Sequence, residues 1–252
     1  MGEDMILRTE GLRKAFGGLV ALDDVSVEVE RGSVTLMMGP NGAGKTTFLR
    51  VVCGIYRPDA GRVFFEGQDI TGLRPHEVYR LGLVKTFQIP LPFTRLTVLE
   101  NLLVAARGNP GESVLKAPFR KAWEEKEEEL VEKAFRIMEL LKLDHLWDHP
   151  SYGLSGGQMK LLEIGRALMS DAKMIMMDEP ISGVNPVLAH EIFSRILELK
   201  DKLGITFFII EHRLEIALKY VDYVYVMDRG HLLTQGRPEE VIDDPRVIEA
   251  YL

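Results

Sequence analysis

The chain has 252 residues, of which 46% are hydrophobic and 27% are charged, so it is long enough to bury a substantial core. Its formal net charge of −7 argues against nucleic acid as a partner, because nucleic acids attract basic surfaces. The single cysteine, Cys53, excludes an internal disulfide and is typical of a reducing, intracellular compartment. No apolar run approaches the roughly 20 residues that span a bilayer, so we expect partners to determine any membrane location.

The chain contains two kinds of strand pattern. Residues 25–30 alternate valines with polar side chains, which is typical of a half-buried antiparallel strand. Residues 62–66 follow a turn signal at 57–61, and we expect another strand of the same kind there. Three other runs, at 34–38, 174–177 and 205–210, are apolar on both faces, as expected of central parallel strands covered by helices. The sequence therefore predicts an α/β fold with a mostly parallel sheet and an antiparallel β subdomain near the N-terminus.

The stretch from about 95 to 170 has a helical character. Apolar residues recur at helical spacing from Leu130 to Leu141, which predicts an amphipathic helix with one buried stripe. We interpret the acidic run at 124–129 as a solvated helix face and not as a binding site. Because no repeat or long linker separates this stretch, we expect one domain over 1–252, with a helical subdomain inserted at about 95–170.

Residues 39–46 match the phosphate-loop pattern G-x-x-x-x-G-K-[ST] between a predicted strand and a predicted helix. Glycines in this loop let backbone N–H groups converge on phosphate oxygens at the positive end of the helix. Lys45 adds a charge at the β- and γ-phosphates, and the Thr46 hydroxyl is a ligand for Mg²⁺. The expected nucleotide-binding residues are Gly39, Pro40, Asn41, Gly42, Ala43, Gly44, Lys45, Thr46 and Thr47.

Two carboxylates follow the apolar run at 174–177. We expect Asp178 to hold Mg²⁺ and Glu179 to orient or deprotonate the attacking water. The alternative, a pair of solvated acids at a strand end, is disfavoured by the phosphate loop elsewhere in the chain. Gln88 and His212 also follow apolar runs, and strand ends are where open α/β sheets bind ligands.

The run Leu154–Gln158 has the character of a second phosphate loop without a lysine. Ser155, Gly156 and Gly157 open a predicted helix over 159–168. They therefore present backbone N–H groups, a hydroxyl and the positive end of a helix dipole.

These motifs together resemble the ATP-binding-cassette (ABC) ATPases, and the resemblance covers nearly the whole chain. It rests on the phosphate loop, Gln88, Leu154–Gln158, 174–179, 182–185 and His212, which occur in the family's order. It implies a P-loop NTPase core that binds and hydrolyses ATP with Mg²⁺, with Lys45, Gln88, Glu179 and His212 as catalytic residues. By the same resemblance, Gln88 is also a metal residue, which links Mg²⁺ and water to the helical subdomain, and His212 contacts the γ-phosphate. It also implies that the Phe16 side chain stacks on adenine. The alternative is that Phe16 is an aromatic residue of the hydrophobic core.

Within the family, the segments 14–18, 83–90, 96–102 and 107–130 resemble the ATPase subunits of branched-chain amino-acid importers. The ATPases of lipopolysaccharide exporters are an alternative, as are soluble ABC ATPases and, outside the family, P-loop kinases of small molecules. The chain has Asn185 where an aspartate is more usual, which keeps a carbonyl acceptor but loses the charge.

The resemblance also implies partners. A second ABC ATPase chain, identical or related, would place its Ser155–Gln158 run over the γ-phosphate bound to this chain. The same run of this chain would lie over the γ-phosphate bound to the second chain. Transmembrane permease subunits would hold the pair at the cytoplasmic face of the membrane, and an extracytoplasmic substrate-binding protein would act indirectly. We expect the permease to dock near 88–96, where Pro90 and Pro92 stiffen the loop and Phe93 is an apolar anchor. A loop that packs only on its own helices is the alternative.

Overall fold

The computed structural model describes residues 4–251, which form two compact units. The first unit contains the chain up to Gln88 and from Lys173 onward, and the second unit is Ile89–Ala172. The second unit therefore contains the whole stretch expected as the helical insertion.

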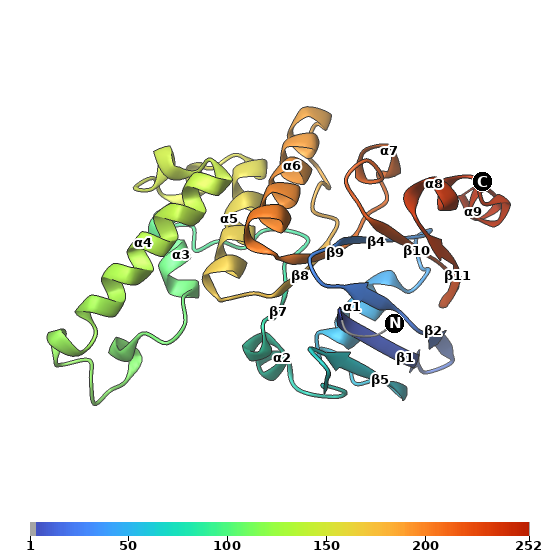
Figure 1. Cartoon of the computed structure of the whole chain (residues 1–252), viewed down its shortest axis with the longest axis horizontal. Helices are drawn as coiled ribbons and strands as arrows, with labels where there is room; N and C mark the ends of the chain where they lie inside the picture. Colours follow the sequence, from blue (N-terminus) through green and yellow to red (C-terminus); the bar gives the residue numbers. More distant parts are fainter. Residues whose placement is uncertain (1–3, 252) are drawn as a thin grey trace. The chain divides into compact units, whose positions relative to one another are not determined.

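A six-stranded sheet forms the centre of the first unit (Figure 1). Its order is β11-β10-β4-β9-β8-β7, and only the edge strand β11 runs antiparallel to its neighbour. All three central strands predicted from doubly apolar runs are present and buried on both faces. The strands are β4 (Val34–Met38), β7 (Leu83–Lys85), β8 (Met174–Asp178), β9 (Thr206–Ile210), β10 (Tyr223–Asp228) and β11 (His231–Gly236).

The antiparallel sheet expected near the N-terminus is also present. It contains β1 (Met5–Phe16), β2 (Leu19–Val25), β3 (Glu28–Glu30), β5 (Ala60–Phe65) and β6 (Gln68–Asp69). The strand expected over 25–30 is interrupted, because the N–H of Val27 donates to the Thr9 hydroxyl at 2.8 Å and not to a ladder carbonyl. The valines at 25, 27 and 29 are nevertheless all buried, so the predicted inward face is confirmed.

Helix α1 (Lys45–Val52) belongs to the hydrophobic core that the two sheets share. Its Phe48 is fully buried and lies against Phe208 of β9, with ring centroids 5.6 Å apart. Because this core fixes α1, it also fixes the loop from which the helix begins. The other helices of this unit are α2 (Pro75–Leu81), α6 (Pro186–Leu203), α7 (Leu214–Ala217), α8 (Pro238–Ile242) and α9 (Pro245–Tyr251).

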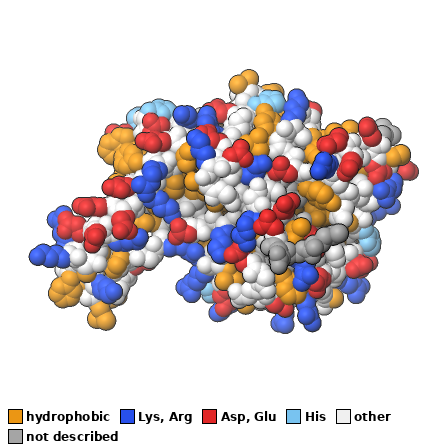
Figure 2. All heavy atoms as spheres, viewed as in Figure 1, with side chains coloured by type: hydrophobic (Ala, Val, Ile, Leu, Met, Phe, Trp, Pro, Cys, Tyr) orange, Lys and Arg blue, Asp and Glu red, His pale blue; other side chains and the backbone are white. Residues whose placement is uncertain are grey.

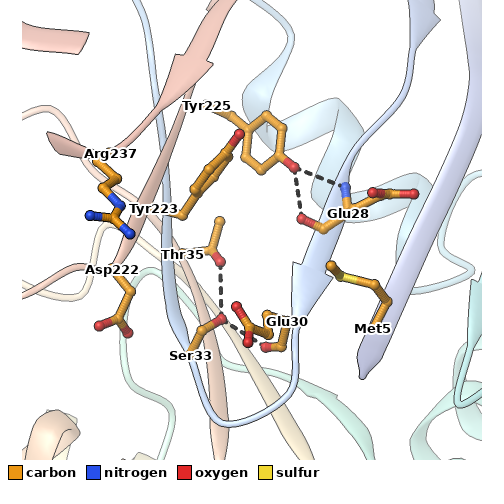
Figure 3. Close-up of a pocket in the computed structure, with 9 residues that line it drawn as sticks. All are labelled: Met5, Glu28, Glu30, Ser33, Thr35, Asp222, Tyr223, Tyr225 and Arg237. Atoms are coloured by element: carbon orange, nitrogen blue, oxygen red, sulfur yellow. Dashed lines mark hydrogen bonds between the residues drawn. The ribbon is translucent and has the colours of Figure 1, made fainter. Parts of the chain in front are cut away.

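Tyr225 of β10 ties the parallel sheet to β3 of the antiparallel sheet (Figure 3). Its hydroxyl donates to the Glu28 carbonyl at 2.7 Å and accepts from the Glu28 N–H at 3.0 Å. Burial raises the pKa of this phenol to about 12. A cavity of about 530 Å³ lies beside it, at the amino ends of β4 and β10. It is thus at the opposite end of the parallel strands from the phosphate loop.

The second unit is helical. Its elements are α3 (Val98–Ala105), α4 (Glu124–Leu141), α5 (Gly156–Met169) and four short 3₁₀ turns at Pro110–Glu112, Arg120–Ala122, Asp144–Leu146 and Ser151–Gly153. The three helices meet closely at Gly165, where a Cβ would lie 2.9 Å from Leu102 of α3 and from Leu141 of α4.

The acidic run at 124–129 begins α4 and is largely exposed, with ion pairs Arg120–Glu124 at 2.8 Å and Lys126–Glu129 at 2.7 Å. This confirms a solvated helix face. Figure 2 shows acidic and basic side chains interspersed over the visible face of the molecule. Within residues 4–251, no helix combines the length and the apolar character needed to cross a bilayer.

Candidate functional site: a nucleotide-binding site

The phosphate loop lies between β4 and α1, at the carboxyl end of a central strand. Gly39 and Gly44 have φ values of 149° and 104°, which side-chain-bearing residues rarely adopt. A Cβ on Gly39 would also collide with the Met227 carbonyl, and one on Gly44 with the Ala21 carbonyl. Only glycine therefore fits at these two positions, and the loop backbone remains open toward a ligand.

Lys45 is held against its own loop. Its side chain is 9% exposed, and Nζ donates to the carbonyls of Gly39 at 2.7 Å and Pro40 at 2.9 Å. Burial lowers the pKa of this ammonium group, while the carboxylates of Glu179 and Asp178 raise it. The structure thus brings the predicted cation and both predicted acids into one electrostatic environment.

Thr46 and Asp178 form the predicted metal-binding pair. The Thr46 hydroxyl donates to Asp178 Oδ1 at 3.5 Å, at the point where β8 ends. Burial raises the pKa of the Asp178 carboxyl. Among residues 4–251 no cluster of three or more His, Cys, Asp or Glu side chains could hold a metal. A metal at this pair would take further ligands from phosphate and water, as Mg²⁺ usually does, and from Gln88 as the resemblance implies.

Glu179 is the centre of the remaining polar contacts. Its Oε2 accepts from Gln88 Nε2 at 2.7 Å, and its Oε1 lies 3.5 Å from His212 Nδ1. The Glu179 N–H donates to the Ile210 carbonyl at 2.8 Å. The structure therefore brings together three residues that the sequence placed only at the ends of separate strands.

A cavity of about 450 Å³ opens over the phosphate loop. Phe16 lines it with 43% of the residue exposed, which contradicts the alternative of a core aromatic. The ring meets Tyr56 edge-on, with centroids 5.2 Å apart, and Lys14 Nζ lies 5.4 Å from its centre. The lining residues are Phe16, Leu19, Val20, Ala21, Asn41, Gly42, Ala43, Gly44, Lys45, Thr46, Thr47, Glu179 and Arg229.

Two parts of this lining were missed by the sequence analysis. Leu19, Val20 and Ala21 come from the start of β2, and Arg229 comes from the turn between β10 and β11. The Asp228-Arg229-Gly230 turn after an apolar strand was the available signal for the arginine. The glycine pair at 17–18 was the signal for the start of β2.

The lysine-free run at 154–158 lies in the second unit and begins α5. The Ser155 hydroxyl accepts from the Gln158 N–H at 3.3 Å, and Gln158 Oε1 accepts from the Ser155 N–H at 2.9 Å. These two contacts form a capping box, so both side chains serve the helix start. Gly156 and Gly157 provide the first N–H groups of the helix. Asn185 plays a similar part in the first unit, where its side chain accepts from the Leu188 N–H at 2.9 Å and caps α6.

Comparisons with known proteins agree with this geometry. A family model described as "ABC transporter" matches residues 22–182, and one described as "Branched-chain amino acid ATP-binding cassette transporter" matches residues 231–252. The chain is 57% identical to a probable branched-chain amino acid transport ATP-binding protein of Methanocaldococcus jannaschii, over 98% of this chain and 97% of the relative. It is 56% identical to a protein of the same description from Archaeoglobus fulgidus, over 98% of this chain and 95% of the relative.

Solved structures give the same result. The ADP conformation of MJ1267, an ATP-binding cassette of an ABC transporter, superposes with a TM-score of 0.86 at 55% identity, over 99% of both chains. The family model alone covers more than half of the chain, and it includes the phosphate loop, Leu154–Gln158 and Glu179. The chain therefore belongs to the ABC transporter family, as an ATP-binding subunit that hydrolyses ATP.

Proposed function

We propose that the chain energises the uptake of branched-chain or other hydrophobic amino acids across a membrane. The names of relatives that are 56% and 57% identical support this substrate class. The match of residues 231–252 to the family model of branched-chain amino acid transporters supports it as well. The observation that carries the energetic part is the arrangement of Gln88 and His212 around the Glu179 carboxylate beside the phosphate loop.

The loop from Gly39 to Thr47 would bind the phosphates of ATP through backbone N–H groups and the Lys45 ammonium. Thr46 and Asp178 would hold Mg²⁺, which when bound neutralises charge on the phosphate oxygens. Phe16 would stack on adenine, since its exposed ring borders the same cavity.

Hydrolysis then needs a base and a fixed attacking water. Glu179 would accept a proton from the attacking water. The water oxygen then bonds to the γ-phosphorus, and the bond between the γ-phosphorus and ADP breaks. Gln88 donates to one oxygen of this carboxylate at 2.7 Å, and His212 Nδ1 lies 3.5 Å from the other. Their contacts support roles in orienting the base and not in replacing it.

Two copies of the cassette would form the active unit. The start of α5 presents N–H groups and a helix dipole, yet Ser155 and Gln158 have no cation beside them in the motif. The anion for these N–H groups would be the γ-phosphate of an ATP molecule bound to the Lys45 loop of a second cassette. ATP would then join the two chains, and hydrolysis would release them.

The segment after Gln88 supports a docking role. Ile89, Leu91 and Phe93 are 74%, 63% and 50% exposed, and prolines separate them. Arg166 fixes this segment by donating to the Leu91 carbonyl at 3.0 Å and by lying 5.3 Å over the Phe93 ring. Exposed apolar side chains on a fixed backbone suit a protein partner, which we take to be the permease at the cytoplasmic face of the membrane. A substrate-binding protein would act through that permease.

The ATP-driven pairing can be tested with Glu179→Gln. We expect hydrolysis to fall at least about 100-fold, because the general base is lost, while ATP binding remains. Gel filtration with saturating ATP should then show a stable dimer. The double variant E179Q/K45A, which lacks the phosphate contact, should stay monomeric. A monomeric E179Q protein with ATP bound would refute the pairing.

The docking role can be tested with Phe93→Asp in proteoliposomes that contain the permease. Transport should be lost while the ATPase activity of the isolated chain is kept, because Phe93 lies outside the nucleotide cavity. Phe119→Asp is the matched control, since Phe119 is an exposed aromatic residue of the same unit. Equal transport by both variants would contradict the assignment. Identification of the permease that co-purifies with the chain, and of its cargo, tests the substrate class.

A further inference from the structure

A fully buried carboxylate, Glu211, lies at the end of β9 beside the predicted catalytic residues. Its Oε1 accepts from the Ile181 N–H at 3.0 Å. Its Oε2 accepts from the N–H groups of His212 at 3.0 Å and Arg213 at 3.3 Å, and lies 3.9 Å from His212 Nδ1. One buried side chain therefore joins two backbone segments, the turn after Glu179 and the turn that carries His212.

Arg213 makes a second connection between the same segments. Its guanidinium donates to the Val184 carbonyl at 2.9 Å, farther along the turn that Glu211 holds at Ile181. The Glu179 N–H is bound in addition to the Ile210 carbonyl at 2.8 Å. The end of β9 thus holds residues 179–184 at three points.

This connection matters because Glu179 has an unfavourable backbone. Its φ is 52°, in the left-handed region that residues with a side chain seldom adopt. Such a conformation persists only where the surroundings fix it, and it is common at active sites. The bonds from Ile210 and Glu211 lie on either side of this residue, so they are placed to hold it.

We propose that Glu211 is a positioning residue for ATP hydrolysis. It keeps the left-handed turn at Glu179 and the backbone of His212 in one frame, so that the Glu179 carboxylate stays between Gln88 and His212. Arg213 supports the same frame from its other end. This inference rests on the proposed role of Glu179 as the base.

The chemistry of the contacts explains why a carboxylate is needed. An ionised carboxylate only accepts, and here both of its oxygens face backbone donors. A glutamine would turn an NH₂ group toward at least one of these N–H groups and would break the connection on that side. Glu211→Gln should therefore displace either the Glu179 turn or the His212 turn while it keeps the size of the side chain.

The test is the steady-state kinetics of Glu211→Gln. We expect kcat to fall about tenfold to a hundredfold, the effect of losing a buried charge-assisted hydrogen bond. KM and the Kd for ATP should stay unchanged, because the hydrogen bonds of the Glu211 carboxylate go to Ile181, His212 and Arg213 and not, within residues 4–251, to the Lys45 loop. Asp222→Asn is the matched control. Asp222 accepts from the Val34 N–H at 2.8 Å at the opposite end of the sheet, so its amide variant should keep the wild-type kcat.

A double variant separates positioning from a general structural role. If Glu211 acts through Glu179, E179Q/E211Q should be no slower than E179Q alone, whereas independent effects would multiply. A wild-type kcat in E211Q, multiplied effects, or a parallel loss of ATP affinity would each overturn the proposal. If E211Q does not fold, Arg213→Gln tests the frame from its other end, and an unchanged kcat there would refute it. Unimpaired hydrolysis by E179Q would instead refute the proposed function.

Discussion

The substitution Asn101→Asp would test how the segment that carries Phe93 is held. Asn101 of α3 is fully buried, and its Oδ1 accepts from the Phe93 N–H at 2.8 Å. Its Nδ2 lies within hydrogen-bond distance of four acceptors in the same unit: the carbonyls of Phe93 at 3.1 Å, Leu96 at 3.2 Å and Thr97 at 2.9 Å, and the Ser151 hydroxyl at 3.2 Å. An aspartate keeps the acceptor but loses both donor hydrogens.

The magnitude follows from those two donor hydrogens. Each buried hydrogen bond left unmade costs about 1–3 kcal/mol, so we expect a loss of about 2–6 kcal/mol in the stability of the helical unit. For a chain of this size, that corresponds to a melting temperature lower by roughly 4–24 °C. Burial also favours the neutral acid, which raises the pKa of the new carboxyl. The deficit should therefore grow as the pH rises through that pKa and shrink as the pH falls.

Thermal unfolding at two pH values, with hydrogen exchange of the Phe93 amide, would measure this loss. The matched control is Asn109→Asp, because the Asn109 side chain accepts from the Gly111 N–H at 2.8 Å, as an aspartate also does. Melting of Asn101→Asp within about 1 °C of the wild type would show that the network does not support the segment. So would equal shifts in both variants.

Three further predictions concern the first unit. Lys45→Gln should weaken ATP binding at least about tenfold by calorimetry, since a charge-assisted contact to phosphate is lost, and unchanged affinity would contradict its role. Hydrogen bonds from the Arg74 side chain, and to a lesser extent from its backbone N–H, lower the pKa of Glu77 to about 2. Because the unfolded pKa is 4.5, the ionised carboxylate stabilises the fold above pH 4.5. The stability difference between the wild type and Glu77→Gln should therefore shrink from pH 4.5 toward pH 2 in urea titrations, and a constant difference would refute this. Burial raises the pKa of Cys53 to about 12, so an alkylating reagent at pH 8 should modify it only on unfolding, and rapid labelling of the native chain would show otherwise.

Local patterns were sufficient to predict the central strands and the phosphate loop. The doubly apolar runs at β4, β8 and β9 predicted strands covered on both faces, and each is buried throughout. The glycine spacing at 39–44 likewise determines a loop that other residues cannot form.

Long-range pairing was beyond the reach of these patterns. Strand β1 has 12 residues whose burial does not alternate regularly, because it pairs with β2, β3 and β5 through several register shifts. Its length therefore had no clear signal in the sequence.

The same limit applies to the site. Gln88, Glu179 and His212 each ended an apolar run, so their positions were predictable, but their mutual contacts depend on the order of β7, β8 and β9 in the sheet. Glu211 was overlooked because its function lies in backbone contacts, which no residue spacing reveals. Glu179 was recognised, but its left-handed backbone was not, since that conformation follows from the turn and not from the residue type.

The capping box at the start of α5 has a consequence for the kinetics of assembly. Because Ser155 and Gln158 already bind each other's backbone, the N–H groups of Gly156 and Gly157 are ordered before any phosphate arrives. If two cassettes pair as proposed, little conformational entropy remains to be lost at this contact, and a preorganised surface of this kind associates at a lower free-energy cost. Association of the proposed pair would then not wait for slow ordering of the helix start.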